Sequence, residues 1–516
     1  MENMKKLPIG IQSFEVIRTE GYYYVDKTIF VEKLVSGGKY YFLSRPRRFG
    51  KSLFLDTLRQ AFLGKRELFK GLYLENHWDW DRCYPVVYIS FGAGVHRDVE
   101  ELRITEEEIL EAHARKYKLT LTRPSIKGKF LELIEMLCEE HNEKVVVLID
   151  EYDKPILDNI EHPEVARETR EELKNFYSVL KDADPYLKFV FITGVSKFSK
   201  VSLFSGLNNL NDITIHPRYA TICGYTQEEF ETVFADRLSG VSFEEVSRWY
   251  NGYSWLGEPV YNPFDILLYL DSGLFRAYWF ETGTPTFLIK LLLERKYYLP
   301  KLEELEVGEE LLESFDVDYI RPETLLFQTG YLTIKRRETS VFGDIFYTLT
   351  YPNLEVKKNF YNYFLNFLVK DVEVKSQLKR RVERAIVSGE VEEMVESFKG
   401  FLVSIPHDWY RKTELAGYEG FYASVFYAFF TALGVEVRVE EPTNRGRLDM
   451  ALMFEDKCYL FEFKVVEGER EGKALEELKA RGYHEKYTGR FKEIYLIGIE
   501  FSKSKRNIVS YKWESF

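Results

Sequence analysis

Cysteine is scarce in this chain, whose 516 residues include only four. They have neither the spacing of a metal-binding motif nor the density of a disulfide framework. This argues against a secreted, disulfide-stabilised protein and predicts a reduced protein of the cytoplasm. The four are Cys83, Cys138, Cys223 and Cys458.

Long apolar segments are also missing. The longest run without a charged residue, 420–435, has sixteen residues and contains Ser424 and Thr431, whereas a bilayer span needs roughly 20. The run therefore predicts a buried helix. The first residues, Met1 to Lys6, lead into no signal-like apolar core. We expect no membrane association.

Positive charge is in short supply, because 71 Lys and Arg face 83 Asp and Glu and leave a net charge of −12. This excludes a generally basic nucleic-acid coat but leaves room for a local basic groove. Hydrophobic residues make up 45% of the chain and aromatic residues 16%, enough for packed cores. The length predicts two to four domains.

The first part of the chain alternates short apolar strands with helical stretches, which is typical of an α/β fold. The strands lack polar alternation, as expected for a parallel sheet covered on both faces. The predicted strands are Tyr40–Leu43, Val86–Ser90, Val145–Ile149 and Lys188–Ile192.

A candidate phosphate-binding loop follows the first strand and ends in Gly50-Lys51-Ser52. In such a loop Lys51 neutralises the β- and γ-phosphates, and the hydroxyl of Ser52 binds Mg²⁺. The new helix N-terminus also favours anions. Arg45 replaces the first glycine of the usual pattern, at a cost in backbone freedom. Alone, the loop is weak evidence, and a solvated basic loop is the alternative.

Two acids after the third strand strengthen the nucleotide interpretation. We expect Asp150 to hold Mg²⁺ through water and Glu151 to orient or deprotonate the attacking water. An alternative exists, since acids often follow buried strands. Because both halves of the site follow plausible strands, the sequence predicts binding of ATP with Mg²⁺.

Further residues around this site carry weaker signals. Thr193, at the end of the fourth strand, is a candidate sensor of the γ-phosphate, although a helix-capping role fits equally well. Arg47 and Arg48 are candidates to stabilise charge on the transferring phosphate.

The middle of the chain reads as mainly helical. Thr226 and Glu229 predict a capping box at a helix start. A helix ending at Gly330, followed by a hairpin of Tyr331–Arg337 and Ile345–Tyr351, is compatible with a winged-helix module, and equally with a connecting lobe. Residues 372–400 read as a charged helical linker.

A predicted hairpin near the C-terminus carries two acids and a lysine. A two-residue turn at Glu455-Asp456 sets Asp449 opposite Glu462, with Cβ atoms roughly 5 Å apart. Such like charges repel unless a divalent cation lies between them. Lys464 points to the same face. The alternative is that these are solvated strand residues.

The hairpin therefore predicts metal-dependent hydrolysis of a phosphodiester. We expect Asp449 and Glu462 to bind one or two Mg²⁺ ions, with Mn²⁺ as a substitute. Lys464 would position the attacking water and stabilise the developing charge. Nearby basic residues could contact phosphates. They are Arg445, Arg447, Lys479, Arg481, Lys486 and Arg490.

Several motifs give the chain a family resemblance that covers most of its length. It resembles prokaryotic AAA-ATPase-like proteins that carry a C-terminal PD-(D/E)XK nuclease-like domain. The resemblance matches Asp449, Glu462 and Lys464 to the nuclease core. The N-terminal motifs are Leu7-Pro-Ile-Gly10, Tyr24-Val-Asp-Lys-Thr28, Arg45-Pro-Arg-Arg-Phe-Gly-Lys-Ser52, Asp150-Glu-Tyr-Asp-Lys-Pro155 and Thr193-Gly-Val-Ser-Lys-Phe198.

The resemblance implies an additional acid on the helix before the hairpin, with Glu419 the better candidate metal ligand and Glu414 behind it. Members of the family often carry a glutamine in the helix after the lysine strand, and this chain has Glu477 instead. Tyr483 and Tyr487, four residues apart, either stack on bases or pack in the core.

Pattern and resemblance together predict a P-loop NTPase-type parallel sheet domain, a helical and winged-helix-like middle region, and a restriction-endonuclease-like α/β domain. The expected regions are an AAA-ATPase-like domain at 1–225, a helical lid-like region at 226–290, a winged-helix-like module at 291–371, a helical linker at 372–404 and the nuclease-like domain at 405–516.

The expected function is cleavage of nucleic acid, DNA before RNA, under the control of bound ATP. The alternative is a nucleotide-gated protein that binds DNA or a partner without cleaving it. Self-association is left open.

Overall fold

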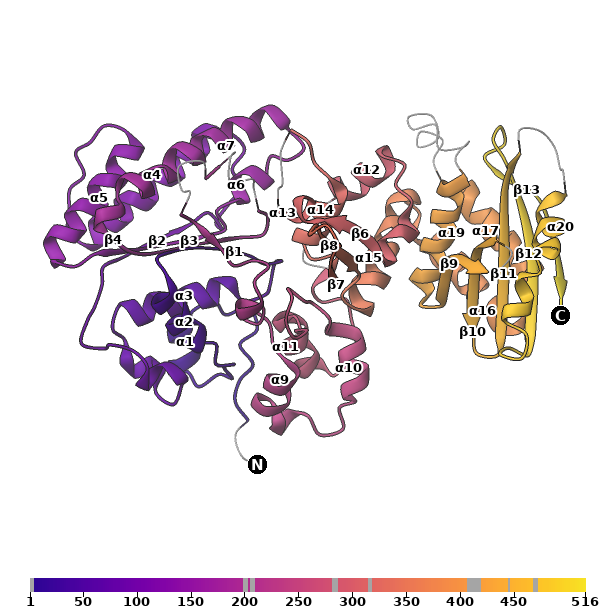
Figure 1. Cartoon of the computed structure of the whole chain (residues 1–516), viewed down its shortest axis with the longest axis horizontal. Coiled ribbons are helices and arrows are strands. Elements are labelled where there is room, and N and C mark those ends of the chain that lie inside the picture. Colours follow the sequence, from indigo (N-terminus) through magenta and orange to yellow (C-terminus); the bar gives the residue numbers. More distant parts are fainter. Residues whose placement is uncertain are drawn as a thin grey trace. The chain divides into compact units, whose positions relative to one another are not determined.

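A computed structural model of the chain divides into two compact units (Figure 1). The first unit comprises Met1–Trp279 with Glu304–Asn353, and the second comprises Phe280–Glu303 with Leu354–Phe516. The structure describes residues 4–197, 203–204, 209–280, 286–313, 318–405, 419–443, 446–466 and 472–516.

The first unit is built on a five-stranded parallel sheet of order β2-β3-β4-β1-β5. Its strands confirm the four predicted ones and add a short fifth. Because the sheet is parallel, the carboxyl ends of its strands meet at one edge. The strands are β1 (Tyr40–Ser44), β2 (Val86–Ser90), β3 (Val145–Asp150), β4 (Leu187–Gly194) and β5 (Asn211–Asp212).

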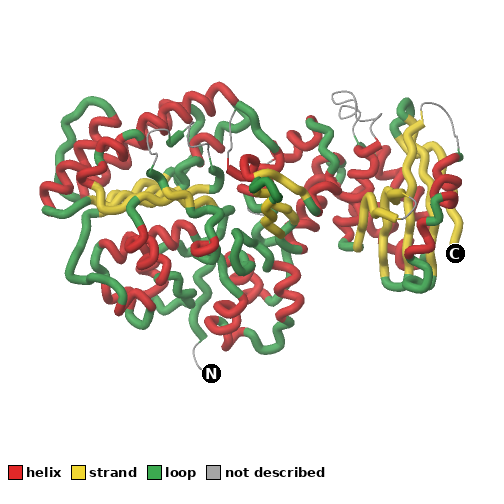
Figure 2. The backbone as a smooth tube through the Cα atoms, viewed as in Figure 1, coloured by secondary structure: helices red, strands yellow, loops and turns green. Residues whose placement is uncertain are grey.

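Helices cover both faces of this sheet (Figure 2). One face carries α1 (Phe14–Thr19), α2 (Ile29–Gly37) and α3 (Lys51–Phe62). The helices on the other face are α4 (Val99–Lys116), α5 (Ile126–His141), α6 (Lys154–Leu157) and α7 (Pro163–Tyr177). The short helix α8 (Val179–Asp182) packs against α5 and α7.

Three further helices follow the sheet in the same unit. The first of them starts at the predicted capping box, in which the Thr226 hydroxyl and the Glu229 carboxylate each accept from the other residue's backbone N–H. The three are α9 (Gln227–Val233), α10 (Phe243–Tyr250) and α11 (Pro263–Ser272).

The predicted hairpin between residues 331 and 351 is present as two strands of a small antiparallel sheet of order β6-β8-β7. Gly330 follows the preceding helix with φ +93°. A strand, two helices and a hairpin are compatible with a winged helix, which stays a prediction. The elements are β6 (Leu305–Gly308), α13 (Glu309–Glu313), α14 (Pro322–Gln328), β7 (Thr333–Thr339) and β8 (Ile345–Thr350).

The second unit contains a five-stranded mixed sheet of order β13-β12-β11-β10-β9. Strands β11 and β12 are parallel and the other neighbouring pairs are antiparallel. The strands are β9 (Glu436–Thr443), β10 (Gly446–Phe454), β11 (Lys457–Val466), β12 (Glu493–Ser502) and β13 (Asn507–Ser515).

Helices cover this second sheet as well. The apolar run predicted to be a buried helix is α19 (Glu419–Leu433), and Phe426 packs on Phe463 of the sheet with ring centroids 4.9 Å apart. Across the described segments, no helix combines the length and apolar character that a membrane span requires. The other helices are α12 (Thr286–Glu294), α15 (Leu354–Leu368), α16 (Val372–Ser388), α17 (Val391–Val403) and α20 (Lys473–Ala480).

The stretch predicted as a charged linker is part of the second unit. Its helices α16 and α17 are tied to the sheet, because Tyr459 donates from its hydroxyl to the Ile386 carbonyl at 2.7 Å and Trp513 Nε1 donates to Glu392 at 2.8 Å. Most charged residues of these helices occupy their outer faces, with Lys375 as a buried exception, while apolar side chains are buried. Charge content alone therefore does not distinguish a linker from a surface helix.

A buried acid in α4 gives the first unit a predicted pH dependence. Glu106 has no exposed surface, and neither carboxyl oxygen has a hydrogen-bond partner within the described residues. Burial, and then the nearby charge of Glu172, raise its pKa to about 9. The folded state thus holds a proton that the unfolded chain releases near its ordinary pKa of about 4.3.

We expect Glu106→Gln to remove a stability loss that the wild type shows as pH rises. Because the folded pKa is raised, stability falls between about pH 5 and pH 9, by about 1.4 kcal/mol per pH unit. Urea unfolding at several pH values measures this slope. Glu108→Gln, at an exposed position of the same helix, should keep the wild-type slope, and an unchanged slope in Glu106→Gln would contradict the assignment.

Two candidate functional sites

The loop between β1 and α3 turns through left-handed backbone at two positions. Gly50 has φ +88° and precedes the first residue of α3, while Arg48 has φ +67°. Glycine adopts such angles without strain. Helix α3 starts at Lys51, and no side chain of the described residues caps its N-terminus. Its free first-turn N–H groups suit an anion.

The Lys51 ammonium is held by the loop itself. Its Nζ donates to the carbonyl oxygens of Arg45 at 2.9 Å and Pro46 at 2.8 Å. The side chain is buried. Burial lowers the pKa of Lys51, and the charge of Asp150 acts in the opposite direction. A buried ammonium whose acceptors among the described residues are neutral carbonyls gains from an incoming anion.

Arg45 has a role that the sequence did not indicate. Its guanidinium is fully buried and donates to the carbonyl oxygens of Ser44 and Thr214 at 2.9 and 2.8 Å. It also stacks over the Trp255 ring, 4.0 Å from the centroid. Burial lowers its pKa to about 10. The side chain therefore anchors the loop to the β5 side of the sheet.

The loop is held from another direction by residues late in the first unit. Trp279 Nε1 donates to the Arg47 carbonyl at 3.1 Å. A Cβ on Gly330 would collide with the Pro46 ring, so this glycine allows the two segments to approach closely. The guanidinium of Arg48 lies 4.8 Å from the centroid of Phe264.

The two predicted acids lie at the carboxyl end of β3. Asp150 is buried and accepts from the Tyr88 hydroxyl at 3.2 Å and from the Glu151 backbone at 3.0 Å. Burial, and then the charge of Asp150, raise the pKa of Glu151. Glu151 has φ +50°, an uncommon value for a residue with a side chain. The charges of Asp150 and Glu151 both act on Lys51, so the structure brings the two halves of the predicted site together.

Thr193 is placed differently from the predicted sensor. Its hydroxyl is fully buried and donates to the Leu43 carbonyl at 2.8 Å. It braces β4 against β1. Ser52, the other predicted hydroxyl, is half-buried in the first turn of α3.

Asp153 is a site-forming residue that sequence reasoning missed. It is buried and accepts from the backbone N–H groups of Val195 and Ser196, the latter at 2.6 Å. Burial raises its pKa and these hydrogen bonds oppose the rise. The residue fixes the turn after β4. Its signal in the sequence is its position as the third acid of the run Asp150-Glu-Tyr-Asp153.

An apolar pocket beside Gly50 was also missed, because its walls come from four separate segments of the chain. Lys27 lies in the wall, with Nζ paired to Glu229 at 2.6 Å and donating to the Thr221 carbonyl at 2.9 Å. The remaining lining residues are Pro8, Ile17, Tyr23, Tyr24, Val25, Phe49, Gly50, Leu53, Phe54, Ile222, Cys223, Gly224, Tyr225 and Pro263.

The C-terminal hairpin has the predicted register. Strands β10 and β11 pair from Phe454↔Lys457 to Met450↔Phe461 around a two-residue turn, in which Glu455 has φ +51°. Asp449 and Glu462 occupy the next positions along the two strands.

The two hairpin acids lie in contrasting surroundings. Asp449 is half-buried and accepts from the Phe463 backbone at 2.7 Å. Glu462 is 4% exposed, and burial, then the charge of Asp449, raise its pKa to about 8. Its Oε2 has no hydrogen-bond partner in the described part of the chain. A buried carboxyl oxygen without a partner, beside a second acid, fits a site for a cation.

Lys464 takes part in a network of charges on the α20 side of the sheet. Its Nζ lies 2.7 Å from the Glu477 carboxylate. Arg481 lies 3.7 Å from the same carboxylate and 3.3 Å from Glu462 Oε1. A Cβ on Gly498 would collide with the backbone of α20, so this glycine lets the helix approach the sheet. The pairing of Lys464 with Glu477 was not predicted.

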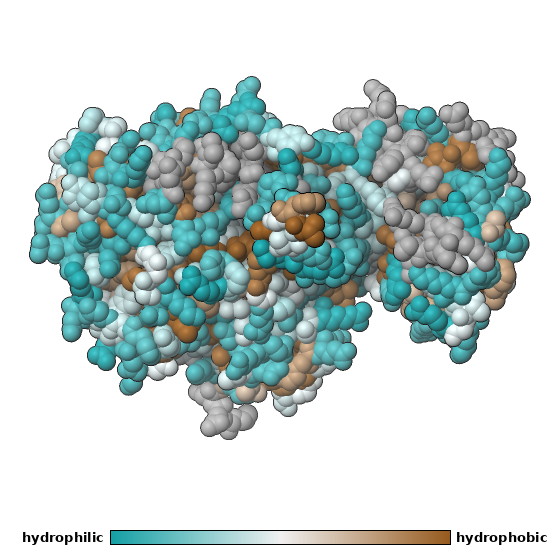
Figure 3. All heavy atoms as spheres, viewed as in Figure 1, coloured by the Kyte–Doolittle hydropathy of each residue, from teal (hydrophilic) through white to brown (hydrophobic). Residues whose placement is uncertain are grey.

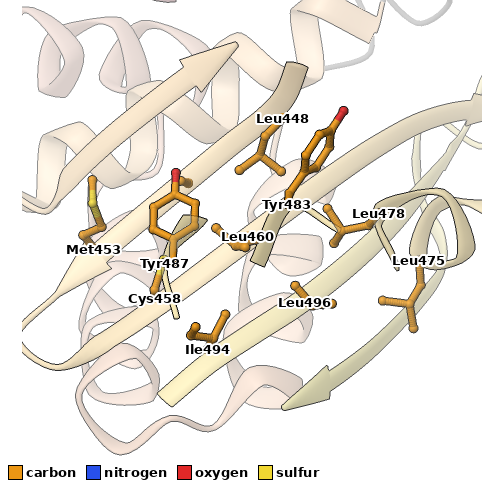
Figure 4. Close-up of a cluster of buried hydrophobic side chains, with 11 residues drawn as sticks. Leu448, Met453, Cys458, Leu460, Leu475, Leu478, Tyr483, Tyr487, Ile494 and Leu496 are labelled. Atoms are coloured by element: carbon orange, nitrogen blue, oxygen red, sulfur yellow. The ribbon is translucent and has the colours of Figure 1, made fainter. Parts of the chain in front are cut away.

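The two tyrosines near this network belong to the core. Tyr483 and Tyr487 are buried with apolar side chains of β10, β11, β12 and α20 (Figure 4). The structure therefore shows the second of the two predicted alternatives, in which these tyrosines pack in the core. The cluster contains Leu448, Ala451, Met453, Cys458, Leu460, Leu475, Leu478, Tyr483, Tyr487, Ile494 and Leu496.

Some predicted residues cannot be placed. Glu419 begins α19, but its side chain lies outside the described residues, as do Glu414 and Arg445. Within the residues described, no group of three or more His, Cys, Asp or Glu forms a candidate metal cluster. Among the described residues, the candidate metal ligands are therefore the pair Asp449 and Glu462.

Comparison with known proteins finds a family match in each of the two units. Residues 8–204 match a family described as "Predicted AAA-ATPase", and residues 417–511 match the PD-(D/E)XK nuclease superfamily. The chain therefore belongs to the AAA-ATPase-like proteins that carry a C-terminal domain of the PD-(D/E)XK nuclease superfamily. It is 49% identical to the "Uncharacterized protein in vnfD 5'region" of Azotobacter chroococcum mcd 1, over 99% of each chain. Domains of these two kinds generally use a nucleotide and a divalent metal.

Proposed function

We propose that the first unit binds ATP together with Mg²⁺. Lys51 would exchange the loop carbonyls for the β- and γ-phosphates, and the N-terminus of α3 would receive the phosphate oxygens. Ser52 and Asp150 would hold the ion. Glu151, whose pKa is raised by burial and by the charge of Asp150, would orient or deprotonate the attacking water.

The apolar pocket beside Gly50 is our candidate site for the nucleoside. It adjoins the phosphate loop, and its walls include the rings of Tyr24, Phe49 and Tyr225. Flat aromatic and aliphatic surfaces suit a purine base. This continuity of an apolar pocket with an anion-binding helix start is what favours a nucleotide over inorganic phosphate.

We propose that the second unit cleaves nucleic-acid phosphodiesters, with DNA as the preferred substrate. Asp449 and Glu462 would hold a divalent ion, which when bound polarises the scissile phosphate and lowers the pKa of a bound water. Lys464 would orient that water and neutralise charge that develops on the phosphate. The observation that carries the proposal is buried Glu462 beside Asp449, with an Oε2 that accepts no hydrogen bond from any described residue.

A cleavage assay tests this proposal directly. The full chain is incubated with end-labelled linear duplex, circular duplex and RNA, in Mg²⁺ or Mn²⁺, with and without ATP. We expect cleavage of DNA that needs the metal and changes with ATP. Absence of cleavage from every substrate, together with ATP-dependent DNA binding, would instead support the second candidate, a nucleotide-gated binding protein. The pairing of Lys464 with Glu477 favours that candidate.

A further inference from the structure

Two cationic side chains surround the Glu477 carboxylate, as they would surround a bound phosphate group. Lys464 and Arg481 approach the same carboxylate, and all three side chains are partly exposed, at 31%, 41% and 37%. They are therefore within reach of a ligand. The cations come from different places, Lys464 from β11 and Arg481 from the end of α20.

A carboxylate and a phosphodiester present similar groups to such a pair. Each carries one negative charge shared between two oxygens that point the same way, and each accepts hydrogen bonds from Lys and Arg. The pairs of Glu477 with Lys464 and with Arg481 lower the pKa of Glu477, so the carboxylate is charged at neutral pH. It also lies next to the acid pair, because Arg481 touches Glu462 at 3.3 Å.

We propose that Lys464 and Arg481 form a binding subsite for a backbone phosphate of nucleic acid, and that the Glu477 carboxylate occupies this subsite until the nucleic acid displaces it. The inference rests on the proposed nuclease function and assigns Glu477 to the resting state of its site. Glu477 is a positioning residue, since it holds Lys464 and Arg481 in place and withholds them from the substrate.

Substitution of Glu477 by glutamine removes the charge of this side chain while keeping its shape. Glutamine keeps the length and one oxygen acceptor, but it cannot neutralise two cations. We expect Glu477→Gln to bind a duplex oligonucleotide about threefold to tenfold more tightly, since each partly exposed ion pair that binding must break is weak. The logarithm of its affinity should also fall more steeply with the logarithm of salt concentration, because fewer protein charges compete with the phosphates.

The measurement is fluorescence anisotropy of a labelled duplex in Ca²⁺, so that binding is recorded apart from Mg²⁺-dependent cleavage. Glu476→Gln is the matched control, because Glu476 is exposed on the same helix and its loss removes the same charge. This control should bind within about twofold of the wild type. The double variant Glu477→Gln/Arg481→Ala should lose the gain. Melting temperatures establish that all variants are folded.

Equal affinity of Glu477→Gln and Glu476→Gln would overturn the inference, as would a gain that survives the loss of Arg481. Failure of the proposed nuclease function looks different: wild type and Glu477→Gln would both fail to cleave in Mg²⁺ or Mn²⁺ while the difference in binding persists. If no form of the protein binds nucleic acid, both the subsite and the nuclease function are wrong.

Discussion

Asp449→Asn is expected to reduce nucleic-acid cleavage by about a hundredfold to a thousandfold or more, because the variant loses one of the two charges that hold the catalytic ion. Asparagine keeps an oxygen that can accept from the Phe463 backbone, as Asp449 does at 2.7 Å. The hairpin should therefore stay folded. Removing the repulsion with Glu462 should leave the melting temperature equal to that of the wild type or above it.

The test is specific because cleavage should fall while the melting temperature should stay the same or rise. Cleavage is measured with a labelled duplex in Mg²⁺ and unfolding with a thermal melt. Asp456→Asn is the control, since Asp456 lies in the turn of the same hairpin and pairs with Lys492 at 3.0 Å. It should cleave as the wild type does. Loss of cleavage together with a large fall in melting temperature would make Asp449 a structural residue, and retained cleavage would contradict the metal assignment.

Lys51→Met is expected to weaken ATP binding by about a hundredfold, which is the effect of losing charge-assisted hydrogen bonds worth roughly 2–3 kcal/mol. Without nucleotide the variant should be as stable as the wild type or more so. The reason is that the Lys51 ammonium is buried, with carbonyls as its hydrogen-bond acceptors, and methionine fills a similar volume without that desolvation cost.

Isothermal titration with ATP and Mg²⁺ measures the affinity, and urea unfolding measures the stability. Lys65→Met, an exposed position just beyond α3, serves as the control and should bind ATP normally. An unchanged affinity in Lys51→Met would place the nucleotide elsewhere. A destabilised Lys51→Met would mean that the lysine serves the loop more than the ligand.

Features with local periodicity could be predicted from the sequence. The strand ending at Asp150 is a short apolar run, and the pairing around Glu455-Asp456 follows from a period of two and a two-residue turn. Both required only neighbouring residues. The acids at 150, 151, 449 and 462 could be located for the same reason.

Features that depend on distant packing could not be predicted. The inward direction of Arg45 depends on Thr214 and Trp255, which lie far along the chain. The pocket beside Gly50 needs four separate segments. The carboxylate that meets Lys464 comes from a helix whose depth is set by Gly498. None of these contacts leaves a periodic pattern in the sequence.

Hydrophobic residues exposed on the surface are a further feature that could not be predicted from the sequence (Figure 3). Val341 and Phe342, at the tip of the β7–β8 hairpin, are 96% and 91% exposed. A hydrophobicity pattern would place such residues in a core. Their exposure follows from the turn geometry between the two strands, because Ser340 and Asp344 close the turn with a backbone hydrogen bond of 2.8 Å.

The interleaving of the two units along the chain has a consequence for synthesis on the ribosome. The first unit requires Glu304–Asn353, yet Phe280–Glu303, which precedes that segment, belongs to the second unit. The early sheet can form while translation continues, but the first unit is complete only after residue 353 has emerged. Meanwhile α12, with buried leucines such as Leu288 and Leu292, must wait for its partners. Folding of this chain is therefore expected to finish after translation, with α12 as the exposed element that a chaperone would meet first.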